Sequence, residues 1–104
     1  MKALKDYSGR AIRFTRERLA HVLEHPEMAG MEEAIAETLL APEFVVQSVS
    51  DAQARLYYRF YYGTRVGNKF LCVVVKILDA DAFVVTAYLT DRVKKGQLLW
   101  SAKG

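Results

Sequence analysis

The stretch ARLYYRFYYGTRVGNKFLCVVVKILDADAFVVTAYLT, residues 54–90, carries the clearest secondary-structure pattern in this chain. Its residues alternate with a period of two and are rich in Val, Tyr and Phe, which suits a pleated sheet. Short connectors divide it into three predicted strands, at residues 54–62, 69–78 and 82–90. Because these connectors leave no room for crossover helices, we expect the strands to pair antiparallel as a meander.

Two helices are predicted upstream of this meander. The first covers about residues 15–25, because Thr15 offers a hydroxyl N-cap and Pro26 excludes helical backbone just before it. The second covers about residues 31–40, where apolar residues recur at helical spacing until Pro42 closes the pattern. Both helices therefore precede most of the predicted sheet.

The remaining segments complete a single domain. Residues 11–14 predict a short extended lead-in, and residues 44–49 predict the first strand of the sheet. In the tail, residues 91–104, the apolar residues 98–100 predict a last edge strand or a docking segment. With 52% hydrophobic and 26% charged residues, the chain can bury one core. The sequence thus predicts an α+β domain over residues 1–104, with two N-terminal helices and an antiparallel sheet of about four strands.

Composition excludes several classes of protein. The longest apolar stretch, residues 70–78, contains Lys76 and is far shorter than the roughly 20 residues of a membrane helix. No secretion signal is recognisable, so we expect a cytoplasmic protein with no membrane contact. Cys72 is the only cysteine, which excludes an intramolecular disulfide and predicts a buried, inert thiol. The net charge of +3 is compatible with a polyanionic partner.

Alternation within the strands sorts polar residues onto common faces. One consistent arrangement gathers a basic, aromatic and hydroxyl-rich set on the sheet face away from the helices. Such a face suits single-stranded RNA, because guanidinium groups meet phosphates while aromatic rings stack on bases. An ordinary half-exposed strand face is the alternative interpretation. The set consists of Arg55, Tyr57, Arg59, Tyr61, Lys76, Thr86, Tyr88 and Thr90.

The two histidines are the other candidates for chemistry. His21 and His25 are four residues apart and lie on one side of the first helix, which leaves solvated side chains, zinc binding and acid/base work open. The segment HVLEH lacks the HExxH order of metalloproteases, and no P-loop or nucleophile elbow occurs, so we expect no metal or other cofactor. Metal-independent RNA cleavage needs only a base, a cation and an acid, which these residue types can supply.

Several segments, in this order and spacing, resemble the phage and bacterial domains grouped with the barnase, EndoU, colicin and RelE-like nucleases. The resemblance covers roughly residues 12–100, and HxxxHPE, PEFV, VVVK and TAY are its most specific elements. The matching segments are IRFTRERLAHVLEHPEM (12–28), TLLAPEFVVQS (38–48), LYYRFYY (56–62), FLCVVVKI (70–77) and FVVTAYLTDRVKKG (83–96).

The resemblance implies a RelE/barnase-like fold, with N-terminal helices packed on a curved antiparallel sheet of about four strands. Members are mostly known or predicted metal-independent ribonucleases, often toxins or phage-borne proteins, and some are held inactive by an antitoxin or immunity protein. By resemblance His21 or His25 is the acid/base residue. The cationic partners would be Arg59 and Lys76, and Thr86 or Tyr88 would lie near the scissile phosphate.

Three hypotheses of function follow. The first is a small metal-independent ribonuclease or ribonuclease toxin, which requires a histidine close to Arg59 or Lys76. The second is a non-catalytic module that binds RNA or a protein, which requires the basic face but leaves the histidines distant from it. The third is a dimerising structural protein, in which the tyrosines of LYYRFYY are buried between two chains.

Overall fold

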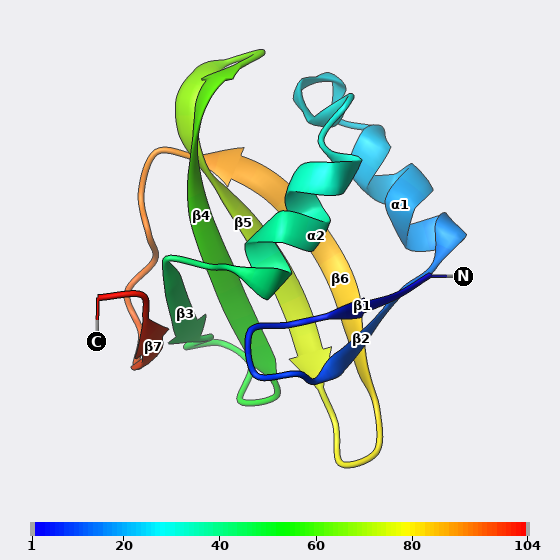
Figure 1. Ribbon diagram of the computed structural model, residues 1–104, viewed down its shortest axis with the longest axis vertical. Coiled ribbons are helices and arrows are strands. Elements are labelled where there is room, and N and C mark those ends of the chain that lie inside the picture. Colours follow the sequence, from blue (N-terminus) through cyan, green and yellow to red (C-terminus); the bar gives the residue numbers. More distant parts are fainter. Residues whose placement is uncertain (1, 104) are drawn as a thin grey trace.

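The computed structural model describes residues 2–103, and it is built from two α-helices and one curled sheet (Figure 1). The α+β class predicted from the sequence is therefore confirmed. In chain order the elements are β1 (Lys2–Lys5), β2 (Ala11–Phe14), α1 (Arg16–Leu23), the 3-10 turn η1 (Pro26–Met28), α2 (Glu32–Leu40), β3 (Phe44–Gln47), β4 (Ala54–Thr64), β5 (Gly67–Ile77), β6 (Ala82–Thr90) and β7 (Leu98–Ser101).

The sheet is larger than predicted, and it is mixed. Its strand order is β1-β2-β6-β5-β4-β3-β7, so the part of the chain that the structure describes holds seven strands instead of about four. The β3–β6 meander pairs antiparallel as expected, but β2 pairs parallel with β6. The helices and three strands lie between β2 and β6 in the chain, and such a long connection permits parallel pairing. Two strands also precede the helices, which are therefore not the first elements of the chain.

The ends of α1 are set by a capping hydroxyl group at its start and by a proline shortly after its last residue. The Thr15 hydroxyl accepts a hydrogen bond of 3.2 Å from the backbone N–H of Arg18, which is the predicted N-cap of α1. Pro26 opens η1 instead of continuing α1, so the helix is a turn shorter than residues 15–25. Helix α2 lies within the predicted residues 31–40. No helix in the described residues is long and apolar enough to cross a membrane.

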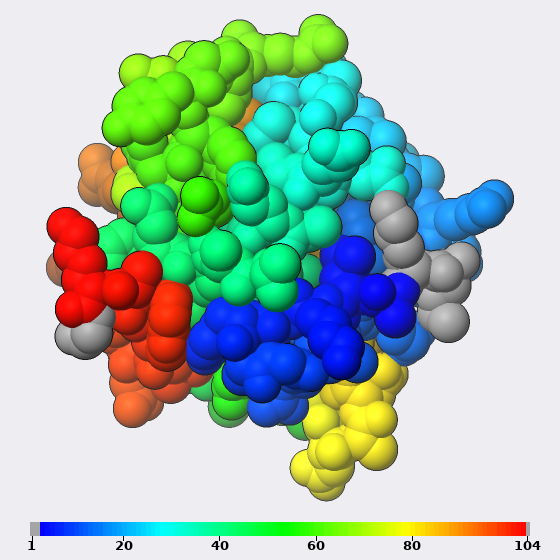
Figure 2. Space-filling model, viewed as in Figure 1, coloured from blue at the N-terminus to red at the C-terminus, as the bar shows by residue number. Residues whose placement is uncertain are grey.

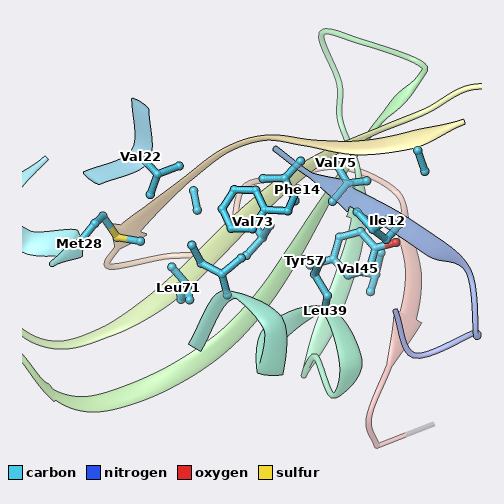
Figure 3. Close-up of a cluster of buried hydrophobic side chains, with 14 residues drawn as sticks. Ile12, Phe14, Val22, Met28, Leu39, Val45, Tyr57, Leu71, Val73 and Val75 are labelled. Atoms are coloured by element: carbon cyan, nitrogen blue, oxygen red, sulfur yellow. The ribbon is translucent and has the colours of Figure 1, made fainter. Parts of the chain in front are cut away.

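The main core lies between the helices and one face of the sheet. Helix α2 lies in front of the sheet in Figure 1 and α1 lies beside β6, with Val22 of α1 in the same core cluster, and the space-filling view of the same side shows α2 packed closely on its neighbours (Figure 2). In Figure 3, Tyr57 of β4 lies among Ile12, Leu39 and Val45, and all four side chains are fully buried. This face is called the covered face below. Most of the apolar free energy of folding comes from its burial.

The opposite face of the sheet, called the open face below, carries neither α1 nor α2. The buried hydrophobic cluster on this face is small, formed among the described residues by Val46, Leu56, Tyr58 and Cys72, and Ala54 is buried beside Lys76. The segment between β6 and β7 covers this cluster, since the backbone N–H of Lys94 donates a 3.1 Å hydrogen bond to the Tyr58 hydroxyl. Cys72 is buried and free, and burial raises the pKa of its thiol, which confirms the buried cysteine expected from the sequence.

Candidate functional site

The strand register divides the predicted RNA-binding face into two halves. Val74 of β5 pairs with Leu56 of β4 on one side and with Thr86 of β6 on the other, so these three residues share one face. Alternation then assigns Lys76, Thr86, Tyr88 and Thr90 to the open face and Arg55, Tyr57, Arg59 and Tyr61 to the covered face. The arrangement of all eight residues on one face away from the helices is therefore wrong.

The tyrosines of the covered half have structural partners. Tyr57 is fully buried, and its hydroxyl donates a 2.7 Å hydrogen bond to Asp6 Oδ2. The Tyr61 hydroxyl donates to Glu37 Oε1 of α2 at 2.6 Å. Burial first, and then this carboxylate, raise the pKa of Tyr61 to about 12. A buried ring cannot stack on a base, so Tyr57 is not available to RNA in this structure.

The arginines of this half also lie on the covered side. Arg59 Nη1 donates a 2.7 Å hydrogen bond to the carbonyl of Ala41, and its Nε lies 3.6 Å from Glu37 Oε1. Arg55 is half-buried on the same strand. These contacts tie β4 to the C-terminal end of α2. The structure thus gives Arg59 a role in packing and leaves only part of its guanidinium free.

The histidines lie on α1 and just after it, on the helix side of the sheet. His21 and His25 are both exposed, and His21 Nδ1 lies 3.7 Å from Glu24 Oε1. Neither histidine lines the hollow that contains Lys76. Among residues 2–103, no group of three His, Cys, Asp or Glu side chains is placed to hold a metal ion. The structure therefore separates the predicted acid/base residues from Lys76, Thr86 and Tyr88.

The open-face half forms one side of a groove of about 490 Å³, which we call the lysine groove. Its walls come from β4, β5 and β6, from the connection between β3 and β4, and from the segment between β6 and β7. The lining side chains with polar groups are Ser48, Ser50, Asp51, Lys76, Thr86, Tyr88, Lys94 and Lys95. Three predicted site residues, Lys76, Thr86 and Tyr88, are thus brought together.

Lys76 is held by a carboxylate at the groove wall. Its Nζ lies 2.6 Å from Asp51 Oδ2, while Asp51 Oδ1 accepts a 2.9 Å hydrogen bond from the backbone N–H of Gln53. The hydrogen bond from Lys76 and then that from Gln53 lower the pKa of Asp51 below its usual value. Asp51 is therefore ionised at neutral pH. The pair orients the Lys76 ammonium and leaves two of its three N–H donors for another acceptor.

The other two lysines of the groove come from the segment between β6 and β7. Lys94 Nζ is 5.8 Å from the centre of the Tyr88 ring, a distance that allows a cation–π contact. The Tyr88 hydroxyl is buried beside Cys72, its partner in the strand register. Burial raises the pKa of Tyr88, so it presents a neutral ring to the groove. Lys94 and Lys95 are both exposed, and their positive charges favour an anion in the groove.

Sequence reasoning missed Asp51, Lys94, Lys95 and the two serines because they lie in connections. The position of Lys94 and Lys95 depends on Gly96, where an added Cβ would lie 2.4 Å from the carbonyl oxygen of Gln47. The adjacent bond from Gln47 N–H to the Gln97 carbonyl, 2.8 Å long, holds the two segments together. In the sequence alone, two lysines and a glycine in a connection do not indicate a binding site, because the contact with Gln47 that positions them is not visible.

Gly96→Ala is expected to displace this segment. The new methyl group meets a backbone atom, which no side-chain rotation can relieve, so we expect a loss of about 1–3 kcal/mol of unfolding free energy. Urea denaturation measures this loss. Lys95→Ala, an exposed neighbouring change, should alter stability by less than about 0.5 kcal/mol. Equal stability of wild type and Gly96→Ala would show that the close approach is not maintained in solution.

Comparisons with known proteins give no match. No family model matches the sequence, and no curated protein or solved structure matches it either. The chemistry of the groove therefore has to be inferred from its own side chains. Among the described residues these are three cations, one carboxylate and several hydroxyl groups on the open face of a sheet.

Proposed function

We propose that this chain binds single-stranded RNA in the lysine groove and cleaves it without a metal ion. The observation that carries the proposal is the convergence of Lys76, Lys94 and Lys95, from two separate parts of the chain, on one groove. Lysines lining a concave surface attract the phosphates of a nucleic acid. Thr86 and the groove serines add hydrogen-bond donors for phosphate or ribose oxygens.

The cleavage step needs a base, a stabiliser of negative charge and an acid. Asp51 is the carboxylate that lines the groove, and it would take the proton of the ribose 2′-hydroxyl as that oxygen attacks phosphorus. Lys76 and Lys95 would stabilise the charge on the phosphorane oxygens. The bond from phosphorus to the 5′ oxygen then breaks, and the Lys94 ammonium would protonate this leaving oxygen. The products are a 2′,3′-cyclic phosphate and a free 5′-hydroxyl.

Substrate binding would also make Asp51 a better base. In the free protein its pKa is lowered mainly by the hydrogen bond from Lys76. When Lys76 turns toward a phosphate, that bond weakens and the pKa of Asp51 rises toward its ordinary range. The proposal thus assigns proton transfer to the groove and not to His21 or His25, because neither histidine lines it.

The sequence resemblance to the barnase, EndoU, colicin and RelE-like nucleases also supports cleavage. A helix-covered sheet with a cationic open face agrees with a RelE/barnase-like fold, which we retain as a proposal. A toxin held inactive by an antitoxin or immunity protein, acting on RNA in the cytoplasm, belongs to the same proposal. A protein inhibitor of this kind would act by covering the lysine groove.

Incubation with labelled single-stranded RNA in EDTA tests the proposal. Wild type is expected to cleave, and Lys76→Ala to lower the rate about 100-fold, as the loss of one charge-stabilising donor does. His21→Ala and His25→Ala should cleave at the wild-type rate. The matched control is Lys5→Ala, which removes an exposed lysine of the edge strand β1 and should have no effect. Loss of cleavage in a histidine variant alone would contradict the assignment to the groove.

RNA binding without cleavage is the second candidate, and the position of both histidines outside the groove favours it. In this case wild type binds RNA but leaves it intact in EDTA and in magnesium. Lys94→Ala should then weaken binding for all sequences and reduce the slope of log affinity against log salt by about 1. If the protein does not bind RNA even at low salt, both candidates fail.

A further inference from the structure

We infer that Phe60 and Tyr62, near the end of β4, form an aromatic platform that stacks on bases of the RNA strand seated in the lysine groove. This inference rests on the proposed function: the groove would bind the phosphates and riboses of the RNA, and the platform would bind its bases. The Tyr62 side chain is 80% exposed, although tyrosine is a large aromatic residue. An exposed ring on the same sheet face as a cationic groove suits single-stranded nucleic acid, whose bases stack on aromatic rings while its phosphates bind cations.

The platform is held in place by rings beneath it. The Tyr62 and Phe60 ring centres are 5.0 Å apart, and the Phe60 and Phe70 centres are also 5.0 Å apart, in edge contacts. Phe70 in turn contacts the buried Tyr58, with ring centres 6.3 Å apart. The exposed ring therefore has a fixed support and loses little conformational freedom when a base stacks on it.

The platform and the groove lie on the same face of the sheet. Tyr88, which lines the groove, pairs with Cys72 and so lies level with Tyr58 of β4, four residues before Tyr62. Four residues of strand span about 13 Å at roughly 3.3 Å per residue. That length corresponds to about four phosphates at the duplex spacing of roughly 3.4 Å along one strand. One RNA strand of about five nucleotides can therefore reach both places.

The charges around the platform also favour a nucleic acid. Arg59 and Lys103 line the same hollow as Phe60, Tyr62 and Phe70. Glu43 also lines it, and its Oε1 accepts a 2.5 Å hydrogen bond from the backbone N–H of Phe60. That carboxylate is engaged in capping the strand edge. Lys103, together with the part of the Arg59 guanidinium that Ala41 and Glu37 leave free, places positive charge beside the rings, which suits a base and its phosphate better than an apolar protein segment.

The test compares two uncleavable oligomers of six units, 2′-O-methyl oligouridylate and a 2′-O-methyl abasic ribose phosphate of equal charge, by fluorescence anisotropy at low salt. Wild type is expected to bind the uridine oligomer more tightly. Tyr62→Ala should weaken that binding about 5- to 100-fold, the range for stacking of one base, and leave abasic binding unchanged. Tyr62→Phe should bind like wild type. The matched control is Leu40→Ala on α2, which removes a 60% exposed apolar side chain and should change neither affinity.

Three results would contradict the proposal that the platform stacks on RNA bases. Equal affinity of wild type for both oligomers, with no effect of Tyr62→Ala, would leave the groove as a phosphate site alone. Dissociation of a wild-type dimer by Tyr62→Ala, seen by light scattering, would assign the ring to an interface between copies. Failure of wild type to bind either oligomer would remove the proposed function itself, and this result is distinct from the other two.

Discussion

Replacement of Tyr57 by alanine is expected to lower the free energy of unfolding by about 3–5 kcal/mol, the usual cost of removing a large buried aromatic ring. Tyr57 is fully buried in the main core, among Ile12, Leu39 and Val45 (Figure 3). Urea denaturation of the purified protein measures the change. Tyr62→Ala on the same strand is the matched control, and its 80% exposed ring should cost less than about 0.5 kcal/mol.

The milder change Tyr57→Phe isolates the hydroxyl group. It removes the 2.7 Å hydrogen bond to Asp6 Oδ2 and leaves the ring, so we expect a cost of about 1–3 kcal/mol. Burial raises the pKa of Asp6, but hydrogen bonds from Ser8, Tyr57 and Arg10 together outweigh it and leave the pKa below its usual value of 3.8. Native Asp6 therefore binds its proton less readily than unfolded Asp6 does.

The sign of the pH dependence follows from this lowered pKa. The stabilisation by Asp6 is present above pH 3.8, the usual pKa, and is lost as the pH falls through the lowered native value. In Tyr57→Phe the pKa of Asp6 moves back toward normal, so the difference in stability from wild type should shrink on acidification from pH 6 to about pH 2. A difference that stays constant would show that Asp6 and Tyr57 are not coupled.

These variants also test the correction of the sheet faces. If Tyr57→Ala folds with wild-type stability but loses RNA binding, Tyr57 is exposed in solution and the face assigned from the sequence is right. Alternation alone could not decide this point, because both faces of β4 carry tyrosines. The decisive contacts come from Asp6 and Glu37, which precede β4 by tens of residues in the chain.

The strands that the sequence predicts well are the long ones. β4, β5 and β6 each have nine or more residues, so their alternation is unmistakable. Some four-residue strands are predicted as well: β3 lies within the predicted residues 44–49, and β7 confirms the edge strand, one of the two expectations for residues 98–100. β1 is not predicted, and with four residues each these strands have no clear period, so their pairing partners need the tertiary structure.

The candidate site follows the same rule. Lys76, Thr86 and Tyr88 lie on adjacent long strands, so alternation along those strands is enough to place them on one face. Asp51 lies in a connection where local hydrogen bonds hold the turn and the ion pair with Lys76 places its carboxylate, and Lys94 is positioned by the bond from its N–H to the Tyr58 hydroxyl. The histidine spacing predicts a shared helix side, but it does not predict against which sheet face that helix packs.

Asp51→Asn is expected to separate binding from cleavage, with opposite signs. Asparagine keeps an oxygen that can accept the hydrogen bond from Gln53 N–H, so the turn should be preserved. A phosphate seated about 5 Å from this carboxylate would be repelled by about 0.8 kcal/mol in bulk water, so removal of the charge should tighten RNA binding at least about 4-fold. Loss of the proton acceptor should lower the cleavage rate about 10²- to 10⁴-fold. Anisotropy with a 2′-O-methyl version of the RNA, which has no attacking hydroxyl, measures binding, and single-turnover cleavage of the unmodified RNA in EDTA measures the rate.

A variant that binds RNA more tightly but cleaves it more slowly cannot be explained by unfolding or by a change in net charge alone. An unfolded protein loses both binding and cleavage, and circular dichroism would detect it. Asp79→Asn removes an exposed negative charge in the connection between β5 and β6, so it controls for net charge and should leave both quantities unchanged. If Asp51→Asn binds more tightly and cleaves at least as fast as wild type, Asp51 only restrains Lys76, and the base must be another group.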